Sequence, residues 1–209
     1  MQAFHFDTVD STNEAAKRLI GDGRIRDSAY IVAREQTAGK GTQGRSWLSP
    51  RDAGLYMSVV HAGGPLSAIP TGTVYALSAG VACVEALRED FDLPVWIKPV
   101  NDLFVEGRKL GGILIETLAQ NGAITALITG VGVNVRRACR ALPESGVEPI
   151  SLEDVIPPER VQLFDLASFV ERLVERVSQW HGLVMAGDRP GVERAWQRLV
   201  LPEFHPQAV

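Results

Sequence analysis

A glycine-rich segment at residues 36–47 carries the first side chains that could bind a reacting anion. It reads Gln-Thr-Ala-Gly-Lys-Gly-Thr-Gln-Gly-Arg-Ser-Trp. Its three glycines allow successive backbone N–H groups to turn toward one anion, and Lys40 and Arg45 add the charge that attracts phosphates and carboxylates. The spacing fits neither a P-loop nor a dinucleotide-binding fingerprint. Trp47 favours a loop that closes over a ligand, because a large aromatic side chain seldom rests in water; the alternative is a solvated surface loop.

A second group of polar residues surrounds an expected turn at Glu106-Gly107. Asp102 could hold Mg²⁺, which takes one or two carboxylates beside phosphate oxygens, or could only cap a turn. Lys109 follows the turn, beside glycines that would let a ligand approach the backbone; a solvated lysine on a strand edge is the alternative. The group consists of Lys98, Asn101, Asp102, Lys109, Gly111 and Gly112.

The remaining candidates carry weaker signals. Gly130-Val-Gly-Val-Asn134 could line a pocket or only mark a strand against which another backbone packs. Cys83 is expected in the core. Cys139 follows two arginines, which could lower the pKa of its thiol, but no histidine is adjacent in sequence. The four histidines and two cysteines form no metal-ligand spacing and no disulfide framework.

These segments need a sheet to position them. Alternating or β-branched runs predict strands at 3–6, 30–33, 55–61, 95–98, 103–105, 110–116 and 124–135. A capping box of Ser11 and Glu14 predicts a helix that ends near Gly21, and apolar spacings of three and four predict helices at 71–87, 165–184 and 192–199. Strands precede most of the helices, so the expected class is α+β, a mixed sheet with helices packed on one side. We expect one domain over residues 1–209, with a loop or boundary at 143–158.

Composition excludes several classes of protein. Hydrophobic residues make up 45% and charged residues 22% of the 209 residues, which is ordinary for a globular domain. The formal net charge is −4, which argues against nucleic acid or an anionic membrane as the main partner. The first residues lack the basic start and apolar run of a signal peptide, so we expect none, and no apolar run has transmembrane length. We therefore expect a protein of the reducing cytoplasm.

Taken together, the motifs resemble the catalytic domain of biotin protein ligases, which belong to the biotin/lipoate protein ligase superfamily. No motif is specific alone, but six of them occur in the family's order. They are Asp10-Ser-Thr-Asn13, Gln36 with Gly39-Lys-Gly-Thr-Gln-Gly-Arg-Ser-Trp47, Gly54-Leu-Tyr-Met-Ser58, Lys98-Pro-Val-Asn-Asp102, Lys109-Leu-Gly-Gly-Ile-Leu-Ile-Glu116 and Gly130-Val-Gly-Val-Asn134. The resemblance implies a fold like that of class II aminoacyl-tRNA synthetases.

The resemblance also implies a two-step reaction. The biotin carboxylate attacks the α-phosphorus of Mg·ATP to give biotinyl-adenylate, and a lysine of a biotin carboxyl carrier domain then attacks this anhydride. Lys109, Arg45 and Asp102 would be catalytic, with Asp102 as the Mg²⁺ ligand. The implied biotin-binding residues are Ser11, Thr12, Asn13, Gln36, Gly39, Lys40, Gly41, Lys109, Gly111, Gly112, Gly130 and Gly132. The implied nucleotide-binding residues are Lys40, Arg45, Trp47, Asn101, Asp102 and Asn134.

The sequence departs from the family pattern at three places. The family usually has an arginine where this chain has Thr42, so we expect the adenylate to be released more readily or the acceptor to be selected less strictly. The usual Lys-Trp-Pro-Asn-Asp reads Lys-Pro-Val-Asn-Asp at 98–102. We expect no helix-turn-helix before the domain and no small C-terminal barrel of the kind that many relatives have. Relatives are often homodimers, so a homodimer is a further expectation for this chain.

Two alternatives remain open at this point. One is a lipoate or octanoate ligase or transferase of the same superfamily. The other is a binding protein that kept the pocket for biotin or its adenylate and lost turnover.

Overall fold

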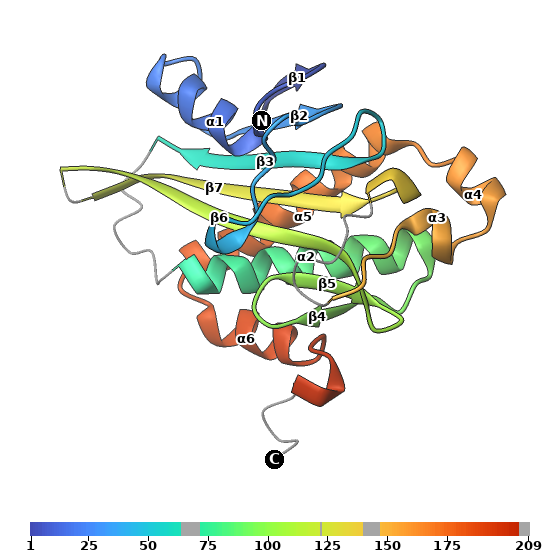
Figure 1. Ribbon diagram of the computed structural model, residues 1–209. Helices are drawn as coiled ribbons and strands as arrows, with labels where there is room; N and C mark the ends of the chain where they lie inside the picture. Colours follow the sequence, from blue (N-terminus) through green and yellow to red (C-terminus); the bar gives the residue numbers. More distant parts are fainter. Residues whose placement is uncertain (64–71, 122, 140–146, 205–209) are drawn as a thin grey trace.

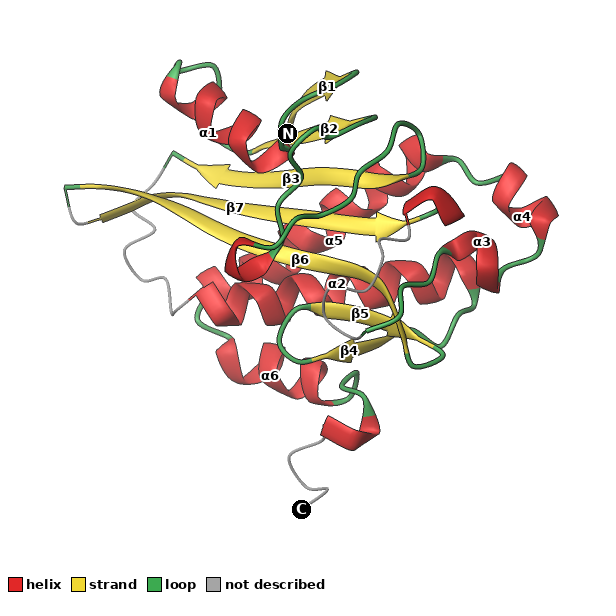
Figure 2. Ribbon diagram, viewed as in Figure 1, coloured by secondary structure: helices red, strands yellow, loops and turns green. Residues whose placement is uncertain are grey.

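The computed structural model describes residues 1–63, 72–121, 123–139 and 147–204 and contains one seven-stranded mixed sheet (Figures 1 and 2). The strand order is β1-β2-β3-β7-β6-β5-β4. Strands β1 and β2 are parallel, and the other neighbours are antiparallel. The strands are β1 (Gln2–Phe6), β2 (Ala29–Ala33), β3 (Gly54–Ala62), β4 (Trp96–Lys98), β5 (Asp102–Val105), β6 (Arg108–Gln120) and β7 (Ala123–Asn134).

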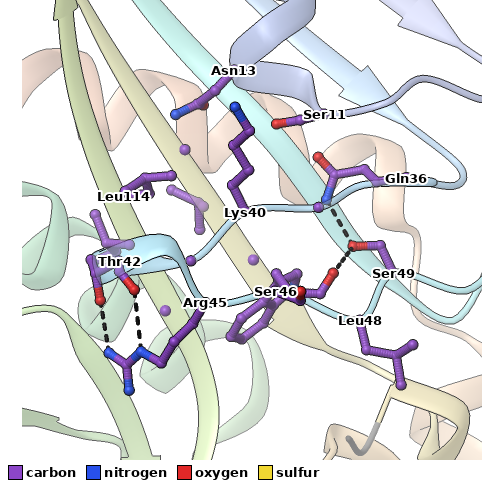
Figure 3. A pocket seen from close by; sticks show the side chains of 18 of the residues that line it. Ser11, Asn13, Gln36, Lys40, Thr42, Arg45, Ser46, Leu48, Ser49 and Leu114 are labelled. Carbon is purple, nitrogen blue, oxygen red and sulfur yellow. Dashed lines mark hydrogen bonds between the residues drawn. The ribbon is translucent and has the colours of Figure 1, made fainter.

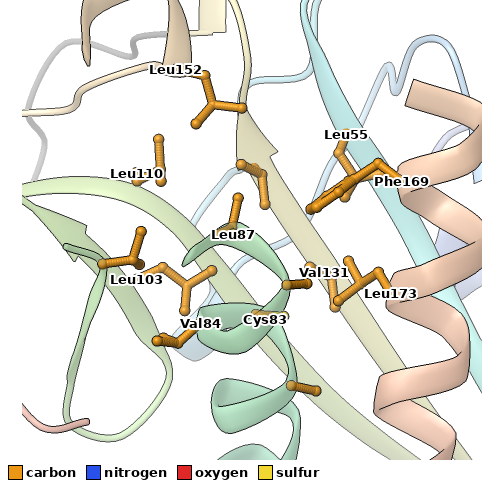
Figure 4. Close-up of a cluster of buried hydrophobic side chains, with 14 of the residues drawn as sticks. Leu55, Cys83, Val84, Leu87, Leu103, Leu110, Val131, Leu152, Phe169 and Leu173 are labelled. Carbon is orange, nitrogen blue, oxygen red and sulfur yellow. The ribbon is translucent and has the colours of Figure 1, made fainter. Parts of the chain in front are cut away.

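Two long helices, α2 (Gly72–Phe91) and α5 (Leu166–Met185), cover one face of this sheet. Figure 4 shows Leu55 of β3 and Val131 of β7 directed toward Phe169 and Leu173 of α5. Burial of this apolar surface is the main stabilising contribution to the fold. The shorter helices are α3 (Leu152–Val155), α4 (Pro158–Gln162) and α6 (Arg189–Gln197).

Helix α1 (Thr12–Gly21) packs on the opposite face, at the β1-β2-β3-β7 end of the sheet. Its Ala16 and Leu19 contact a second apolar cluster that includes Ile31, Val60 and Ile128. Since successive strand residues face opposite sides, Ser58 lies on the same face as Val60. The long connection between β2 and β3 crosses the rest of this face (Figure 1). The face opposite α2 and α5 is therefore the one on which a ligand could bind.

The α+β class with a mixed sheet is confirmed, and each expected strand is present with ends shifted by up to four residues. The expectation that all helices pack on one side is wrong for α1. The helix expected at 71–87 continues to Phe91, because Phe91 packs against Phe164 and Phe169; residue 71 lies outside the described residues. The region 143–158, expected as a loop or a boundary, contains α3 within its described part.

Within the described ranges, no helix is both long and apolar enough to cross a membrane.

Candidate active site

A cavity of about 660 Å³ lies on the sheet face that α2 and α5 leave uncovered. Three glycines form its floor, because β6 and β7 pair Gly112 with Gly132 and place Gly130 one step further along the same face. A Cβ on Gly132 would lie 2.6 Å from the Trp47 indole, and one on Gly130 would lie 2.7 Å from Asn13 Oδ1. Only glycine permits these close approaches. The volume is within the range of small-molecule sites.

The N-terminus of α1 forms an uncharged, hydrogen-bonding end of this cavity (Figure 3). The expected capping box is wrong: the Ser11 hydroxyl makes no capping bond, and Asp10 Oδ1 accepts the Ser11 N–H at 2.8 Å instead. Arg18 hydrogen-bonds the Asp10 carboxylate and lowers its pKa to about 2. Ser11 is thus held in place by its backbone, while its hydroxyl is available to the cavity.

Gln36 connects α1 with the β2–β3 connection. Its Oε1 accepts the Thr12 N–H at 2.8 Å, and its Nε2 donates to Ser49 Oγ at 2.8 Å. Ser49 in turn donates to the Trp47 carbonyl at 3.1 Å. A Cβ on Gly39 would lie 2.4 Å from that carbonyl oxygen. The glycine-rich loop therefore packs tightly against the α1 end of the cavity.

The tip of the glycine-rich loop carries the two cations expected there. Lys40 Nζ lies 2.7 Å from Glu14 Oε1 of α1, so this lysine spans the mouth of the cavity. Arg45 turns back onto its own loop and donates to the Thr42 hydroxyl at 2.8 Å (Figure 3). Both side chains are exposed. Because neither Lys40 nor Arg45 is buried, each side chain can leave its present partner, Glu14 or Thr42, and bind an anionic ligand instead.

Lys109 supplies the cation at the other end. Its Nζ lies 2.7 Å from Asp102 Oδ1, in an ion pair whose angles fall outside hydrogen-bond geometry, and 5.5 Å from the centre of the Trp47 ring. Its backbone is fixed on both sides, since Lys109 N–H donates to the Glu148 carbonyl and Ile150 N–H donates to the Lys109 carbonyl, each at 2.9 Å.

A shift in strand register aims Lys109 into the cavity. Lys109 and Gly112 are three residues apart, so a regular strand would direct them to opposite faces. The pairing of β5 with β6 shifts between Leu103 and Phe104, however. Both Lys109 and Gly112 consequently line the cavity. Such irregularities commonly redirect a side chain at an active site.

Two asparagines of the expected site use their amides to hold backbone. Asn101 donates to the Ile113 carbonyl at 2.8 Å, and the buried Asn134 donates to the Ile150 carbonyl at 3.0 Å. Both line the cavity. Asn101 connects the start of β5, which carries Asp102, to β6, which carries Lys109; Asn134 connects β7 to the segment at Ile150 that hydrogen-bonds the Lys109 carbonyl.

Of the site residues expected from sequence, all but Gly111 line this cavity. A Cβ on Gly111 would lie 2.7 Å from the Gly132 carbonyl oxygen and 3.0 Å from a Leu103 methyl group, so Gly111 faces the core. Lys98, a further candidate, does not line the cavity either; its ammonium lies over the rings of Phe104 and Phe204.

Sequence reasoning missed other residues of the site. Three lining residues have no chemical signature in the sequence that could have identified them: Ser49, Leu114 and Pro149. Cys139 also lines it, but burial raises the pKa of its thiol, so the proposed lowering by neighbouring arginines is wrong. Tyr56, whose hydroxyl lies 3.0 Å from Cys139 Sγ, holds this thiol in the wall.

Asp102 is the one carboxylate among the described residues that line the cavity. The described part of the chain contains no group of three side chains suited to hold a metal ion. A single carboxylate fits Mg²⁺ only when phosphate oxygens and water supply the other ligands. The donor set therefore suits a metal that arrives with a nucleotide and does not form a protein-only metal site.

Comparison with known proteins identifies the relatives of this fold and cavity. Residues 5–134 match the model of the biotin/lipoate A/B protein ligase family. The chain belongs to this family. It is 32% identical over 201 residues to the biotin–[acetyl-CoA-carboxylase] ligase of Paracoccus denitrificans, covering 90% of this chain and 76% of that protein.

Two further relatives extend the comparison. The bifunctional ligase/repressor BirA of Escherichia coli is 36% identical over 141 residues, which cover 66% of this chain but only 41% of that relative. The biotin protein ligase of Aquifex aeolicus, solved in complex with biotin and ATP, superposes with a TM-score of 0.77 at 25% identity and covers 96% of this chain and 78% of its own. The resemblance drawn from the six motifs is thus confirmed for the family and the fold.

Proposed function

We propose that this chain is a biotin protein ligase. In the first step a biotin carboxylate oxygen attacks the α-phosphorus of ATP and pyrophosphate leaves, giving biotinyl-adenylate. In the second step the amine of an acceptor lysine attacks the acyl carbon, AMP leaves and the amine loses a proton. The observation that carries the proposal is that one cavity joins the uncharged, hydrogen-bonding side chains Ser11, Thr12 and Asn13 of the α1 end to a cationic end at Lys109.

The α1 end suits the cyclic urea of biotin. A urea offers two N–H donors and a carbonyl acceptor and carries no charge. Ser11 and Thr12 are buried hydroxyl residues at this end, and their hydroxyls can hydrogen-bond such a head group. Leu114, which shares its face of β6 with Gly112, provides apolar surface nearby for the rest of the vitamin. Fatty acids and lipoate have no urea and would leave these polar groups without partners, which is costly in a buried site.

The Lys109 end suits two anions that must be brought together. A carboxylate and a phosphate repel each other, so a cation fixed between them lowers the energy of the transition state in which they meet. Asp102 holds the Lys109 ammonium, and Arg45 and Lys40 on the loop would add charge once the nucleotide is bound. Trp47 and Asn134 would line the nucleotide part of the cavity.

Mg²⁺ would enter with ATP. Asp102 would supply a carboxylate oxygen to it, beside the phosphate oxygens. When bound, the metal neutralises phosphate charge; the residues of this chain bind and orient the reactants.

For the acceptor we propose a lysine on a biotin carboxyl carrier domain. The support is the name of the Paracoccus denitrificans relative, which is a biotin–[acetyl-CoA-carboxylase] ligase. The Lys40–Glu14 contact closes the mouth of the cavity on one side, so the acceptor lysine would reach the adenylate from the side of Lys109.

Pyrophosphate release tests this function. The protein is incubated with Mg·ATP and biotin, lipoate or octanoate in separate reactions, and binding of each acid is measured in parallel. We expect release that depends on biotin alone. Release with lipoate or octanoate alone would replace the proposal with a lipoyl-type ligase. Tight biotin binding without release would make the chain a binding protein.

A further inference from the structure

A chain of hydrogen bonds runs from Glu116 on β6 to the hydroxyl of Thr12, a residue that lines the cavity. Glu116 Oε2 accepts from Asn13 Nδ2 at 2.8 Å, Asn13 Oδ1 contacts Ser58 Oγ at 2.5 Å, and Ser58 Oγ contacts Thr12 Oγ1 at 2.8 Å. Asn13, Ser58 and Thr12 are all buried. Ser58 and Glu116 do not line the cavity themselves, so they act on a ligand only through their neighbours.

The direction of each bond follows from Glu116. Lys17 Nζ lies 2.7 Å from Glu116 Oε1 in an ion pair, and a carboxylate in an ion pair can only accept. The Asn13 amide must therefore turn its Nδ2 to Glu116 and its Oδ1 to Ser58. Since Oδ1 can only accept, the Ser58 hydroxyl must donate its one proton to Asn13.

The proton of Thr12 is then also committed. Between two hydroxyls either can donate, but Ser58 gives its one proton to Asn13, so the 2.8 Å contact forms with Thr12 Oγ1 as the donor. Gln36 Oε1 is the other acceptor near the Thr12 hydroxyl, but at 3.3 Å its contact is longer, and it already accepts the Thr12 N–H at 2.8 Å. The Thr12 hydroxyl consequently offers the cavity only its lone pairs.

We propose that Glu116, Asn13 and Ser58 are positioning residues that fix Thr12 as a hydrogen-bond acceptor, and that this polarity selects an acid whose head group presents an N–H donor at Thr12. The inference rests on the proposed function and deepens it, because a cyclic urea meets this requirement and a cyclic carbamate with oxygen in that position does not. In the carbamate, two acceptors would face each other in a buried site.

The opposite polarity would need a different charge at Glu116. If Asn13 turned over, its Oδ1 would face Glu116 Oε2, and two acceptors would meet at 2.8 Å unless Glu116 were protonated. A Cβ on Gly130 would lie 2.7 Å from Asn13 Oδ1, so the amide is tightly enclosed and has little room to escape the conflict by moving. Replacing Glu116 with glutamine removes the preference, because a glutamine amide can accept from or donate to Asn13.

The test compares biotin with its two cyclic carbamate analogues, each with one ureido N–H replaced by oxygen. Dissociation constants are measured by calorimetry on the full chain. The quantity compared is a ratio: the dissociation constant of the more weakly bound analogue divided by that of biotin. For wild type we expect a ratio of about 100, which is the scale of the loss when a buried polar group is left unpaired. Glu116→Gln and Ser58→Ala should each reduce this ratio to about tenfold or less, since Thr12 becomes free to donate to the ring oxygen.

Two further variants distinguish the hydrogen-bond chain Glu116–Asn13–Ser58–Thr12, here called the relay, from a general structural effect. Glu14→Gln is the matched control, because Glu14 Oε1 also pairs with Lys17, at 2.8 Å, but no hydrogen bond joins it to Asn13. Its loss also weakens the Lys40 contact at the mouth, but this affects biotin and the analogue alike, so the variant should keep the wild-type ratio. Thr12→Val removes the acceptor itself, so adding Ser58→Ala to it should change the ratio by less than about twofold. Melting temperatures identify any variant that fails to fold.

The outcomes separate this inference from the proposed function. If wild type binds biotin and all variants keep its ratio, the relay is overturned and the ligase function stands. If wild type binds no biotin, the function and the ligand assignment both fail. Neutron diffraction of the free protein tests the relay without any ligand: a deuteron on Thr12 Oγ1 directed to Ser58 supports it, and one directed to Gln36 or to the cavity overturns it.

Discussion

A buried pair of histidines should make this protein lose stability in mild acid. His61 of β3 and His181 of α5 place their Nδ1 atoms 3.5 Å apart, and His181 is fully buried with its Nε2 unpartnered among the described residues. Burial lowers the pKa of His61 from 6.5 to about 4, although Asp27 opposes this, and also lowers the pKa of His181. Both rings are therefore neutral in the folded protein at neutral pH.

The sign of the effect follows from proton uptake. Below about pH 6.5 the unfolded chain protonates these histidines, whereas the folded chain does not protonate His61 until about pH 4. Stability is thus highest above pH 6.5 and falls as the pH drops toward 4. For His61 alone, a shift from 6.5 to about 4 corresponds to a loss of roughly 2 kcal/mol at pH 5 and about 3 kcal/mol at most.

Urea denaturation at pH 8.0, 6.5 and 5.0 measures this loss. His61→Gln should reduce the difference in unfolding free energy between pH 8.0 and 5.0 by about 2 kcal/mol. The exposed His5 of β1 supplies the control, and His5→Gln should leave the difference unchanged. The reasoning is refuted if His61→Gln and wild type lose the same free energy over this range.

Three further changes test the cavity and its frame. Thr42→Arg adds a guanidinium and frees Arg45 from its 2.8 Å bond to Thr42, so release of biotinyl-adenylate in a single-turnover assay should slow; an unchanged rate would contradict the role given to this position. Gly132→Ala places a Cβ 2.6 Å from the Trp47 indole and should raise the KM for ATP or biotin at least about tenfold, whereas Gly182→Ala, which meets no atom within 4 Å, should not. Asn134→Ala removes the 3.0 Å bond to the Ile150 carbonyl and should lower the unfolding free energy by about 1–3 kcal/mol in urea; a variant as stable as wild type would contradict this.

Most strands and helices could be predicted from the sequence, because their formation follows from the pattern of residues that are close in the chain. Strand alternation located β3 and β7, and apolar spacing located α5. The side on which α1 packs could not be predicted, since it depends on which face of β2 and β3 is left by α2 and α5. The ends of α2 were also set by tertiary contacts, as Phe91 shows by packing against α5.

The site was predicted as a set of residues, but not in its orientations. Gly111 and Gly112 are adjacent, and only the register of β6 decides that Gly112 faces the cavity and Gly111 the core. The contact between Asn13 and Glu116 joins residues 103 positions apart. Ser11 breaks the local rule for a helix cap, as residues at functional sites often do; its hydroxyl is kept for the cavity.

The most direct test of the central claim is the rate of biotinyl-adenylate formation when the Lys109 cation is removed. Lys109→Met should lower the single-turnover rate, measured at saturating biotin and ATP, by about 10²–10³-fold. Lys98→Met, which removes a lysine outside the cavity, is the matched control and should keep the wild-type rate. If Lys109→Met forms the adenylate as fast as wild type while remaining folded, Lys109 does not bring the two anions together and the account is wrong.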